Sequence, residues 1–362
     1  MTLHNATKFK AGYTVGLEKS GRHCLVVVAK ASFNLPTESS KPPTLREEDK
    51  QIEIYLTDSF TGEAGYSAPI YENDYAPIKP KCDVILNGSA YSYPEKETTQ
   101  TVVRLRISSL DKSFRVKGVS FWKNGKAEKP KPFTKQPFSY DTAYGGSDLD
   151  RENSTQEEQL YTTFITNPIG QGFYPHCSTR ELEGKALAIT EELEQQAIYP
   201  NHTNYKAQSF GAVARNYYPR YKLGGTYDEY WQEHTRPFLP KDFDEAYYQC
   251  TPKEQQIPYP KGGEEIYLKG LTPNGELSFT LPSIDIPMEA IKANGDREKL
   301  SPVIDTLTFE PDLGYFTMVY RAKIKLKRSI HEIDTVIVGT PNKLWEKKRL
   351  YGECYEEEIS DG

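Results

Sequence analysis

The stretch TVVRLRISSLDKSFRVKGVSF, residues 101–121, contains the clearest fold signal in the chain. In its first half, Val103, Leu105 and Ile107 alternate with polar residues, which is the period of two that a half-buried strand requires. A second strand is expected over residues 113–121. The stretch therefore predicts a β-hairpin with one apolar face.

Similar patterns occur on both sides of this hairpin. Strands are expected at residues 13–17, 24–33 and 82–91 before it, and at 265–271, 276–281, 303–309 and 315–326 after it. Gly, Pro and Asn-Gly turns separate these strands, and no strand–helix–strand rhythm occurs that would indicate a parallel nucleotide-binding sheet. The sequence predicts a mainly β fold: an antiparallel β-sandwich-like scaffold with long Pro-, Tyr- and Gly-rich loops and a few short helices.

The chain is predicted to form a single domain over residues 1–362, with two strand-rich subregions at about 10–130 and 263–345. Between them, residues 131–262 are rich in Pro, Tyr and Gly and show little periodicity. A long irregular segment inside a compact domain is more often functional than idle. This central segment is therefore the expected location of the function.

Two helices are expected in the central segment. The first covers residues 226–233, with Thr226 as its N-cap and acidic residues in its first turn. The second is indicated by a weak helical pattern over residues 181–197.

Composition argues against several classes of protein. The 45 Lys and Arg residues are outnumbered by 51 Asp and Glu residues, giving a net charge of −6 with no basic block, which argues against nucleic-acid binding. The longest apolar run, 24–29, is far below the roughly 18 residues that a membrane span requires. The N-terminus lacks the apolar stretch of a secretory signal, so a cytoplasmic location is expected. Five scattered cysteines without a C-x-x-C pair are predicted to be reduced thiols: Cys24, Cys82, Cys177, Cys250 and Cys354.

No motif for catalysis or for cofactor binding is recognised. The glycine pairs lack the spacing of phosphate-binding loops, and the histidines and cysteines lack the spacing of metal ligands. A G-x-S-x-G nucleophile elbow is also missing from the sequence. We therefore expect no cofactor, no metal and no enzymatic activity.

Acidic residues beside aromatic ones leave one enzymatic alternative open. The acids are Asp228, Glu229, Asp242, Asp244 and Glu245, and the aromatic residues are Tyr227, Tyr230, Trp231 and Phe243. Glycoside hydrolysis uses two carboxylates, so the alternative is a carbohydrate-binding or glycoside-hydrolysing protein. In the other interpretation these acids cap helices and shape turns.

A series of short motifs runs through the chain in a fixed order. They are YDTAYGG (140–146), NPIGQG (167–172), SFGAVAR (209–215), GTYDE (225–229), RPFLPKDFD (236–244), QCTP (249–252) and IDTL (304–307). Over about residues 13–326 this series resembles the bacterial family called domain of unknown function 2169, which is associated with type VI secretion.

The resemblance implies a cytoplasmic adaptor or chaperone without catalytic residues. Such an adaptor would bind a type VI secretion effector and help load it onto the spike, which consists of the valine–glycine repeat protein and its cap. The implied partners are therefore the effector and, in addition, the spike protein or its cap. A further possibility is that the protein itself rides on the spike.

Tyr, Trp and Arg are enriched at interaction surfaces, and the central segment concentrates them. The predicted partner-binding residues are Arg215, Tyr217, Tyr218, Arg220, Tyr227, Tyr230, Trp231 and Arg236. The motif residues that are expected mainly to shape loops are Tyr140, Asp141, Tyr144, Gly145, Gly146, Gly225, Thr226, Asp228, Pro240, Asp242, Phe243, Asp244 and Asp305.

Overall fold

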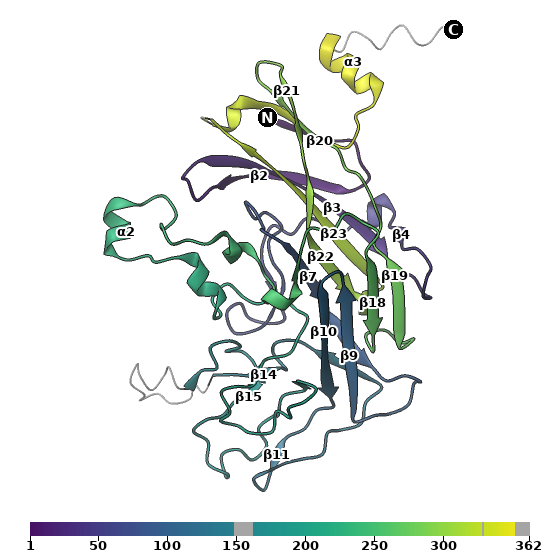
Figure 1. Ribbon diagram of the computed structural model, residues 1–362, viewed down its shortest axis with the longest axis vertical. Coiled ribbons are helices and arrows are strands. Elements are labelled where there is room, and N and C mark those ends of the chain that lie inside the picture. Colours follow the sequence, from purple (N-terminus) through teal and green to yellow (C-terminus); the bar gives the residue numbers. More distant parts are fainter. Residues whose placement is uncertain (148–161, 328, 352–362) are drawn as a thin grey trace.

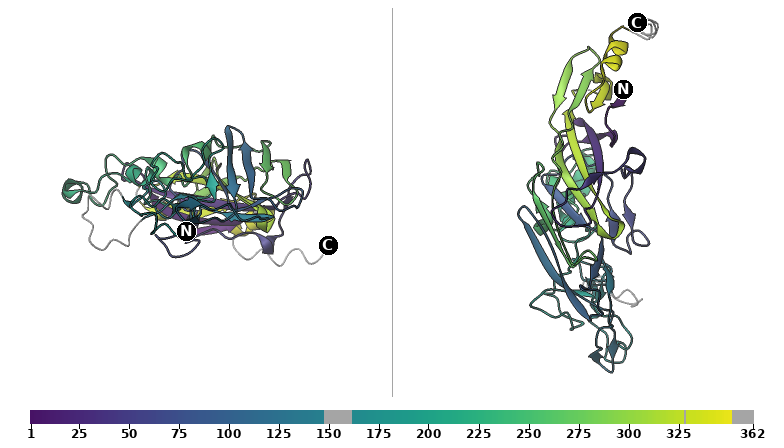
Figure 2. Two further views of the ribbon diagram at one scale, coloured as in Figure 1. Left: turned by 90° about the horizontal axis from the view of Figure 1, so that it is seen from below. Right: turned by 90° about the vertical axis from the view of Figure 1, so that its right-hand side faces the viewer.

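The computed structural model describes residues 1–147, 162–327 and 329–351, and it shows an elongated, flattened molecule made mainly of strands (Figures 1 and 2). The predicted mainly β fold is confirmed. The two α-helices of the described residues are short: α2 (Glu229–His234) projects to one side, and α3 (Lys343–Tyr351) lies at one end. None of the helices in these ranges is long and apolar enough to cross a membrane.

The largest sheet has the order β17–β7–β22–β23–β3–β2, and β4 pairs with β3 outside this path. Its strands are β2 (Lys10–Leu17), β3 (His23–Asn34), β4 (Thr44–Leu45), β7 (Cys82–Leu86), β17 (Gln256–Ile257), β22 (Val303–Glu310) and β23 (Tyr315–Lys325). The longest pairing, between β3 and β23, joins the first and last thirds of the chain.

A second sheet has the order β16–β10–β9–β18–β19 and is antiparallel throughout. Its strands are β9 (Gln100–Ile107), β10 (Leu110–Lys117), β16 (Thr190–Glu191), β18 (Glu265–Lys269) and β19 (Glu276–Thr280). The alternating Val103, Leu105 and Ile107 are buried and belong to one core cluster with Leu25 and Val27 of β3. The two sheets therefore share a core.

A third sheet, with the order β1–β24–β20–β21, lies at the end where the N-terminus and α3 are found (Figure 1). Its strands are β1 (Thr2–Asn5), β20 (Met288–Lys292), β21 (Arg297–Leu300) and β24 (Ile333–Val338). Smaller pairs are β5 (Ser59–Phe60) with β6 (Pro69–Tyr71), β8 (Gly88–Tyr91) with β13 (Lys135–Phe138), β11 (Trp122–Lys123) with β12 (Lys126–Ala127), and β14 (Tyr144–Gly145) with β15 (Gln171–Gly172). Short 3-10 turns complete the chain: η1 (Glu48–Lys50), η2 (Arg220–Gly224), η3 (Glu245–Tyr248), η4 (Lys253–Gln255), η5 (Pro311–Leu313) and η6 (Ile330–Glu332).

Several predicted strands have different limits in the structure. The second strand of the central hairpin starts at Leu110 and not at residue 113, because Ser108 adopts a positive φ of 52° and turns the chain early. The single strand expected at 82–91 is divided at Asn87 into β7 and β8, which belong to different sheets. Asn87 is the last residue bonded to β22, through its amide and the carbonyl of Phe309, and from Gly88 onward the chain pairs with β13 instead.

Two further expectations are wrong in detail. The scaffold is not purely antiparallel, because β22 with β7, β1 with β24, and β14 with β15 pair in parallel. Residues 181–197 do not form a helix: they contain β16 and turns, and Leu182 and Leu187 pack against Trp122 instead.

Candidate functional site

A cleft of about 650 Å³ lies within the central segment and is lined by residues from 163–173, 203–223 and 246–256. Phe164, Phe173 and Tyr205 contribute its apolar lining, while Tyr218 and Gln249 contribute polar groups. The cleft is concave and mostly apolar with a few polar groups, which is typical of ligand and peptide sites.

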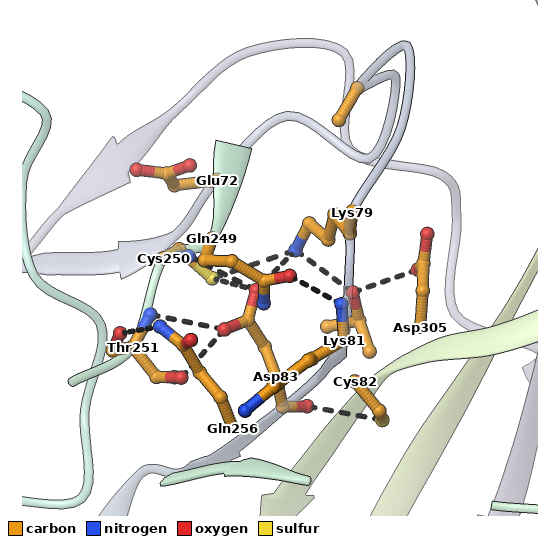
Figure 3. A network of polar contacts seen from close by, with 12 residues as sticks. Glu72, Lys79, Lys81, Cys82, Asp83, Gln249, Cys250, Thr251, Gln256 and Asp305 are labelled. Carbon is orange, nitrogen blue, oxygen red and sulfur yellow. Dashed lines mark hydrogen bonds and ion pairs between the residues drawn. The ribbon is translucent and has the colours of Figure 1, made fainter. Parts of the chain in front are cut away.

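A buried charge network lies next to this cleft and fixes one of its walls (Figure 3). Asp83 of β7 is fully buried and accepts hydrogen bonds from Lys79 Nζ (2.9 Å), from Cys250 N (3.0 Å) and from the Thr251 hydroxyl (2.6 Å). Lys79 Nζ also donates to Thr306 Oγ1 of β22 at 2.9 Å. The QCTP motif is therefore attached to the sheet through one carboxylate.

Burial and the neighbouring charges together set the ionisation of this network. Desolvation would raise the pKa of Asp83, but the charge of Lys79 and the hydrogen bonds from Thr251 and Cys250 outweigh it and lower the pKa. Burial and the neighbouring Asp83 raise the pKa of the Cys250 thiol well above its usual value. Cys250 is therefore held as a neutral thiol, which is not the form that acts as a nucleophile.

Three further buried ion pairs hold residues 72–76 against the scaffold. Lys30 Nζ contacts Asp74 Oδ2 at 2.9 Å and lies over the ring of Tyr55. Arg321 pairs with Asp305 and also donates to the backbone carbonyls of residues 74 and 76. Arg220 pairs with Glu72 and donates to the backbone carbonyl of residue 247 at 3.0 Å. Within the described ranges, no group of three or more His, Cys, Asp or Glu side chains is arranged to hold a metal ion.

Residues 225–243 form an excursion that we call the arm, and α2 lies at its tip (Figure 1). The arm is closed at its base, where Asp242 accepts hydrogen bonds from the amide (3.0 Å) and the hydroxyl (2.8 Å) of Thr226. Gly225 adopts a φ of 83°, and a Cβ atom there would lie only 2.8 Å from Pro240. The base of the arm therefore requires glycine at this position.

The tip of the arm is held by Trp231, whose Nε1 donates to the carbonyl of Phe238 at 2.8 Å. The Tyr227 ring meets the Trp231 ring edge-on at 4.7 Å, and Tyr230 stacks on His234 at 4.6 Å. Tyr227, Tyr230 and Phe238 nevertheless remain about half exposed, at 55, 53 and 48 %. The arm thus carries aromatic side chains that are both fixed and accessible.

The predicted partner-binding residues fall into three places. Tyr227, Tyr230, Trp231 and Arg236 lie on the arm, Tyr218 lines the cleft, and Arg215 is exposed beside Asp58 and Glu72. Tyr217 and Arg220 are only 1 and 5 % exposed, so the structure does not place them on the open surface. Arg220 is one of the residues that line the cleft, and its guanidinium pairs with Glu72.

The expected helix at 226–233 starts later than predicted, at Glu229. Its N-cap is Asp228, which accepts a hydrogen bond from the Trp231 amide at 2.8 Å, because Thr226 is already bonded to Asp242. Asp244 caps η3 through the Ala246 amide. Glu229 and Glu245 lie in the first turns of α2 and η3. All five acids of the carbohydrate alternative thus lie at helix starts or at the base of the arm, where Asp242 has its pKa lowered by the bonds from Thr226.

The remaining motif residues fasten loops to each other. Asp141 accepts hydrogen bonds from Ala68 N (2.8 Å) and Thr61 Oγ1 (2.7 Å), and Tyr144 donates to the carbonyl of residue 199. Gly145 and Gly146 both have positive φ, and a Cβ on Gly145 would overlap the backbone of residue 167. Tyr140, Pro240 and Phe243 are buried.

The buried charges Lys30, Lys79, Asp83 and Arg321 were not predicted from the sequence. Three of them lie inside apolar strands, as Asp83 does in CDVIL. A charged residue in such a strand is costly to bury unless it is paired. Its position in an apolar strand could therefore have predicted a buried ion pair. Cys354, which was expected to be a reduced thiol, lies outside the described residues, whereas Cys24, Cys82 and Cys250 are buried thiols.

Comparison with known proteins identifies a family but no relative of known role. No curated protein and no solved structure matches the chain. Residues 20–321, which contain the shared core, the cleft and the arm, match a family described as an uncharacterized protein conserved in bacteria (DUF2169). The match covers well over half of the chain, and the chain therefore belongs to the DUF2169 family.

Proposed function

We propose that the protein is a non-enzymatic adaptor of the bacterial cytoplasm that binds a type VI secretion effector and helps load it onto the spike. The observation that carries this proposal is the arm, which presents Tyr227, Tyr230 and Phe238 on a fixed support beside the rest of the fold. Aromatic side chains that are already ordered lose little conformational entropy on binding. The resemblance of the chain to the DUF2169 family, which implies this role, also supports the proposal.

The chemistry of the site is in keeping with a binding role. The buried Asp83 and Cys250 form their hydrogen bonds inside the fold, Asp228 and Asp244 cap α2 and η3, and Asp242 closes the base of the arm. The exposed side chains of the arm include the large aromatic Tyr227, Tyr230 and Phe238, which supply contact area. An unstable or apolar part of the effector, such as its link to the spike, is the client that we propose.

The test is co-expression with an effector encoded beside the gene, followed by affinity capture and a binding measurement. Tyr227→Ala with Tyr230→Ala is expected to raise the Kd at least tenfold, since removing one interface anchor costs about 2 kcal/mol or more. Tyr66→Ala with Tyr199→Ala is the matched control, because these tyrosines are also exposed, at 70 and 57 %, and do not belong to the arm. Wild-type affinity in the arm variant would refute the role of the arm. Tight glycan binding lost in Asp242→Asn would favour the carbohydrate alternative.

A further inference from the structure

The strand β2 forms one end of the largest sheet, and no described strand pairs with its outer edge. All eight of its residues stay partly or largely exposed, and Val15 is 45 % exposed, whereas nearly all of the neighbouring β3 is buried. An exposed edge strand offers a row of unpaired N–H and C=O groups to another strand.

The register shows which residues of β2 offer these groups. The amide of Glu18 donates to the carbonyl of Arg22 at 2.9 Å, so these two residues form a hydrogen-bonded pair at the hairpin turn. Because such pairs alternate along antiparallel strands, the even-numbered residues of β2 bond to β3. The backbone groups of Ala11, Tyr13, Val15 and Leu17 therefore point outward, and no other described group bonds to them.

The other edge strands of the three large sheets are shorter than β2, or charged, or covered. β16 and β17 have two residues each, β1 has four, and β21 has four that read Arg-Glu-Lys-Leu. The outer edge of β19 is bonded to the loop between β3 and β4, where the amide of Ser40 donates to the carbonyl of Ser278 at 2.8 Å. β2 has eight residues, a regular register, no proline and one charged residue, Lys10. Natural edges normally carry such protection unless they are used for pairing.

The sequence of β2 is complementary to itself in an antiparallel arrangement. In one register, Ala11 lies opposite Leu17 of the partner subunit and Tyr13 lies opposite Val15 of the partner subunit, so that the numbers of facing residues add to 28. All four residues with outward backbone groups are then paired. An aromatic residue opposite a β-branched one is a favourable cross-strand pair. The same register places Lys10 opposite Glu18 of the partner subunit at both ends of the interface.

The even-numbered positions of β2 fit this arrangement too. Gly12 faces Gly16 of the partner subunit, so no side chains collide along that face of the junction. Within each chain this face is already covered, since a Cβ on Gly12 would overlap the Tyr75 hydroxyl and one on Gly16 would lie 3.2 Å from Pro77. The glycines therefore let residues 75–77 cover the strand while its edge stays open.

We propose that β2 is a dimerisation strand, which pairs antiparallel with β2 of a second copy of this chain around a two-fold axis near Thr14. The hydrogen bonds of Ala11, Tyr13, Val15 and Leu17 join the two largest sheets into one. Lys10 and Glu18 already contact Glu53 (2.6 Å) and Lys323 (2.8 Å) in the same chain, and the Glu18 side chain is only 11 % exposed. These two charges therefore contribute register, and the backbone hydrogen bonds contribute the affinity. The mass in solution and the capture of an effector are separate measurements, so the dimer can fail while the proposed function holds.

The test is the mass of the purified full chain in solution, measured by light scattering and by sedimentation over a range of concentrations. The wild type is expected to be a dimer at about 10 µM. Val15→Pro removes an outward N–H that β3 does not use, so the monomer should keep its fold while the dimer Kd rises at least tenfold. Val15→Thr, which keeps the N–H group and the branched side chain, is the matched control and should remain dimeric.

Charge reversal at Lys10 tests the register. Lys10→Glu should weaken the dimer by placing two acids opposite each other. Lys10→Glu combined with Glu53→Lys keeps an ion pair inside the chain, and it should weaken the dimer to the same extent. Circular dichroism and thermal unfolding check that each variant is folded. A wild type that stays monomeric at about 100 µM, or a folded Val15→Pro that stays dimeric, would overturn the proposal. A monomer that binds an effector only while the β2 edge is intact would assign the edge to a client strand instead.

Discussion

Replacing Lys79 by Met should destabilise the protein strongly, because it leaves the buried carboxylate of Asp83 without its cation. Both side chains are almost completely shielded from solvent, and the Lys79 Nζ to Asp83 Oδ2 distance is 2.9 Å. Removing one partner of a buried ion pair typically costs about 3–5 kcal/mol in the free energy of unfolding. At an m-value of about 3 kcal/mol/M, the urea midpoint should fall by roughly 1–1.7 M.

The assay is urea unfolding followed by tryptophan fluorescence and circular dichroism together. Lys206→Met is the matched control, because the Lys206–Glu192 pair is exposed and its atoms are 3.7 Å apart; its effect should stay within about 0.5 kcal/mol. Lys79→Met combined with Asp83→Asn removes both charges and should recover part of the loss, since a neutral buried pair carries no desolvation cost of an ion. A loss below about 1 kcal/mol in Lys79→Met, or a double variant less stable than the sum of the single ones, would refute this reasoning.

Three more predictions concern pH, the arm and the buried thiols. The pKa of Asp83 is lower in the folded state than in the unfolded state. Its contribution to the free energy of unfolding is therefore full above pH of about 4 and is lost as the pH falls through the folded-state pKa. Urea midpoints of Asp83→Asn should depend less on acidic pH than those of the wild type, and an equal dependence would contradict this. Gly225→Ala should lower the free energy of unfolding by about 1–3 kcal/mol and weaken effector capture. Gly65→Ala is the control, because Gly65 has a similar φ with open space around it, and capture should stay unchanged. Equal capture by both variants would count against a fixed arm. Cys82 and Cys250 should resist alkylation in the folded protein and react in urea, as located by mass spectrometry; labelling of either in the native state would show that the core opens locally.

The local parts of the fold were predictable from the sequence because their signals are local. The alternation at 101–107 gave one face of β9, and Asn124-Gly125 adopts the two positive φ angles, 49 and 71°, that its composition predicts. The arm was recognisable as a motif-rich segment with aromatic residues. Its helix was displaced by two residues or more because Thr226 and Asp228 are both good caps, and only the position of Asp242 decides between them.

The long-range parts could not be predicted in this way. β7 pairs in parallel with β22, which lies more than 200 residues further along the chain, and no periodicity in either strand specifies that partner. The cleft arises where residues 163–173, 203–223 and 246–256 meet, so its existence depends on tertiary packing. The same packing buries Tyr217 and Arg220, whose residue types alone suggested a surface role.

The pairing of β3 with β23 has a consequence for how the protein is made. Cys24 lies opposite Lys325 in this pairing, so β3 can pair with β23 only after nearly the whole polypeptide has been translated. At about 5–20 residues per second, the ribosome needs roughly 15–60 s to supply the missing neighbour. During that time the apolar run at residues 24–29 can pair only with β2. The other edge of β3 is therefore open to aggregation until the last strands have left the ribosome.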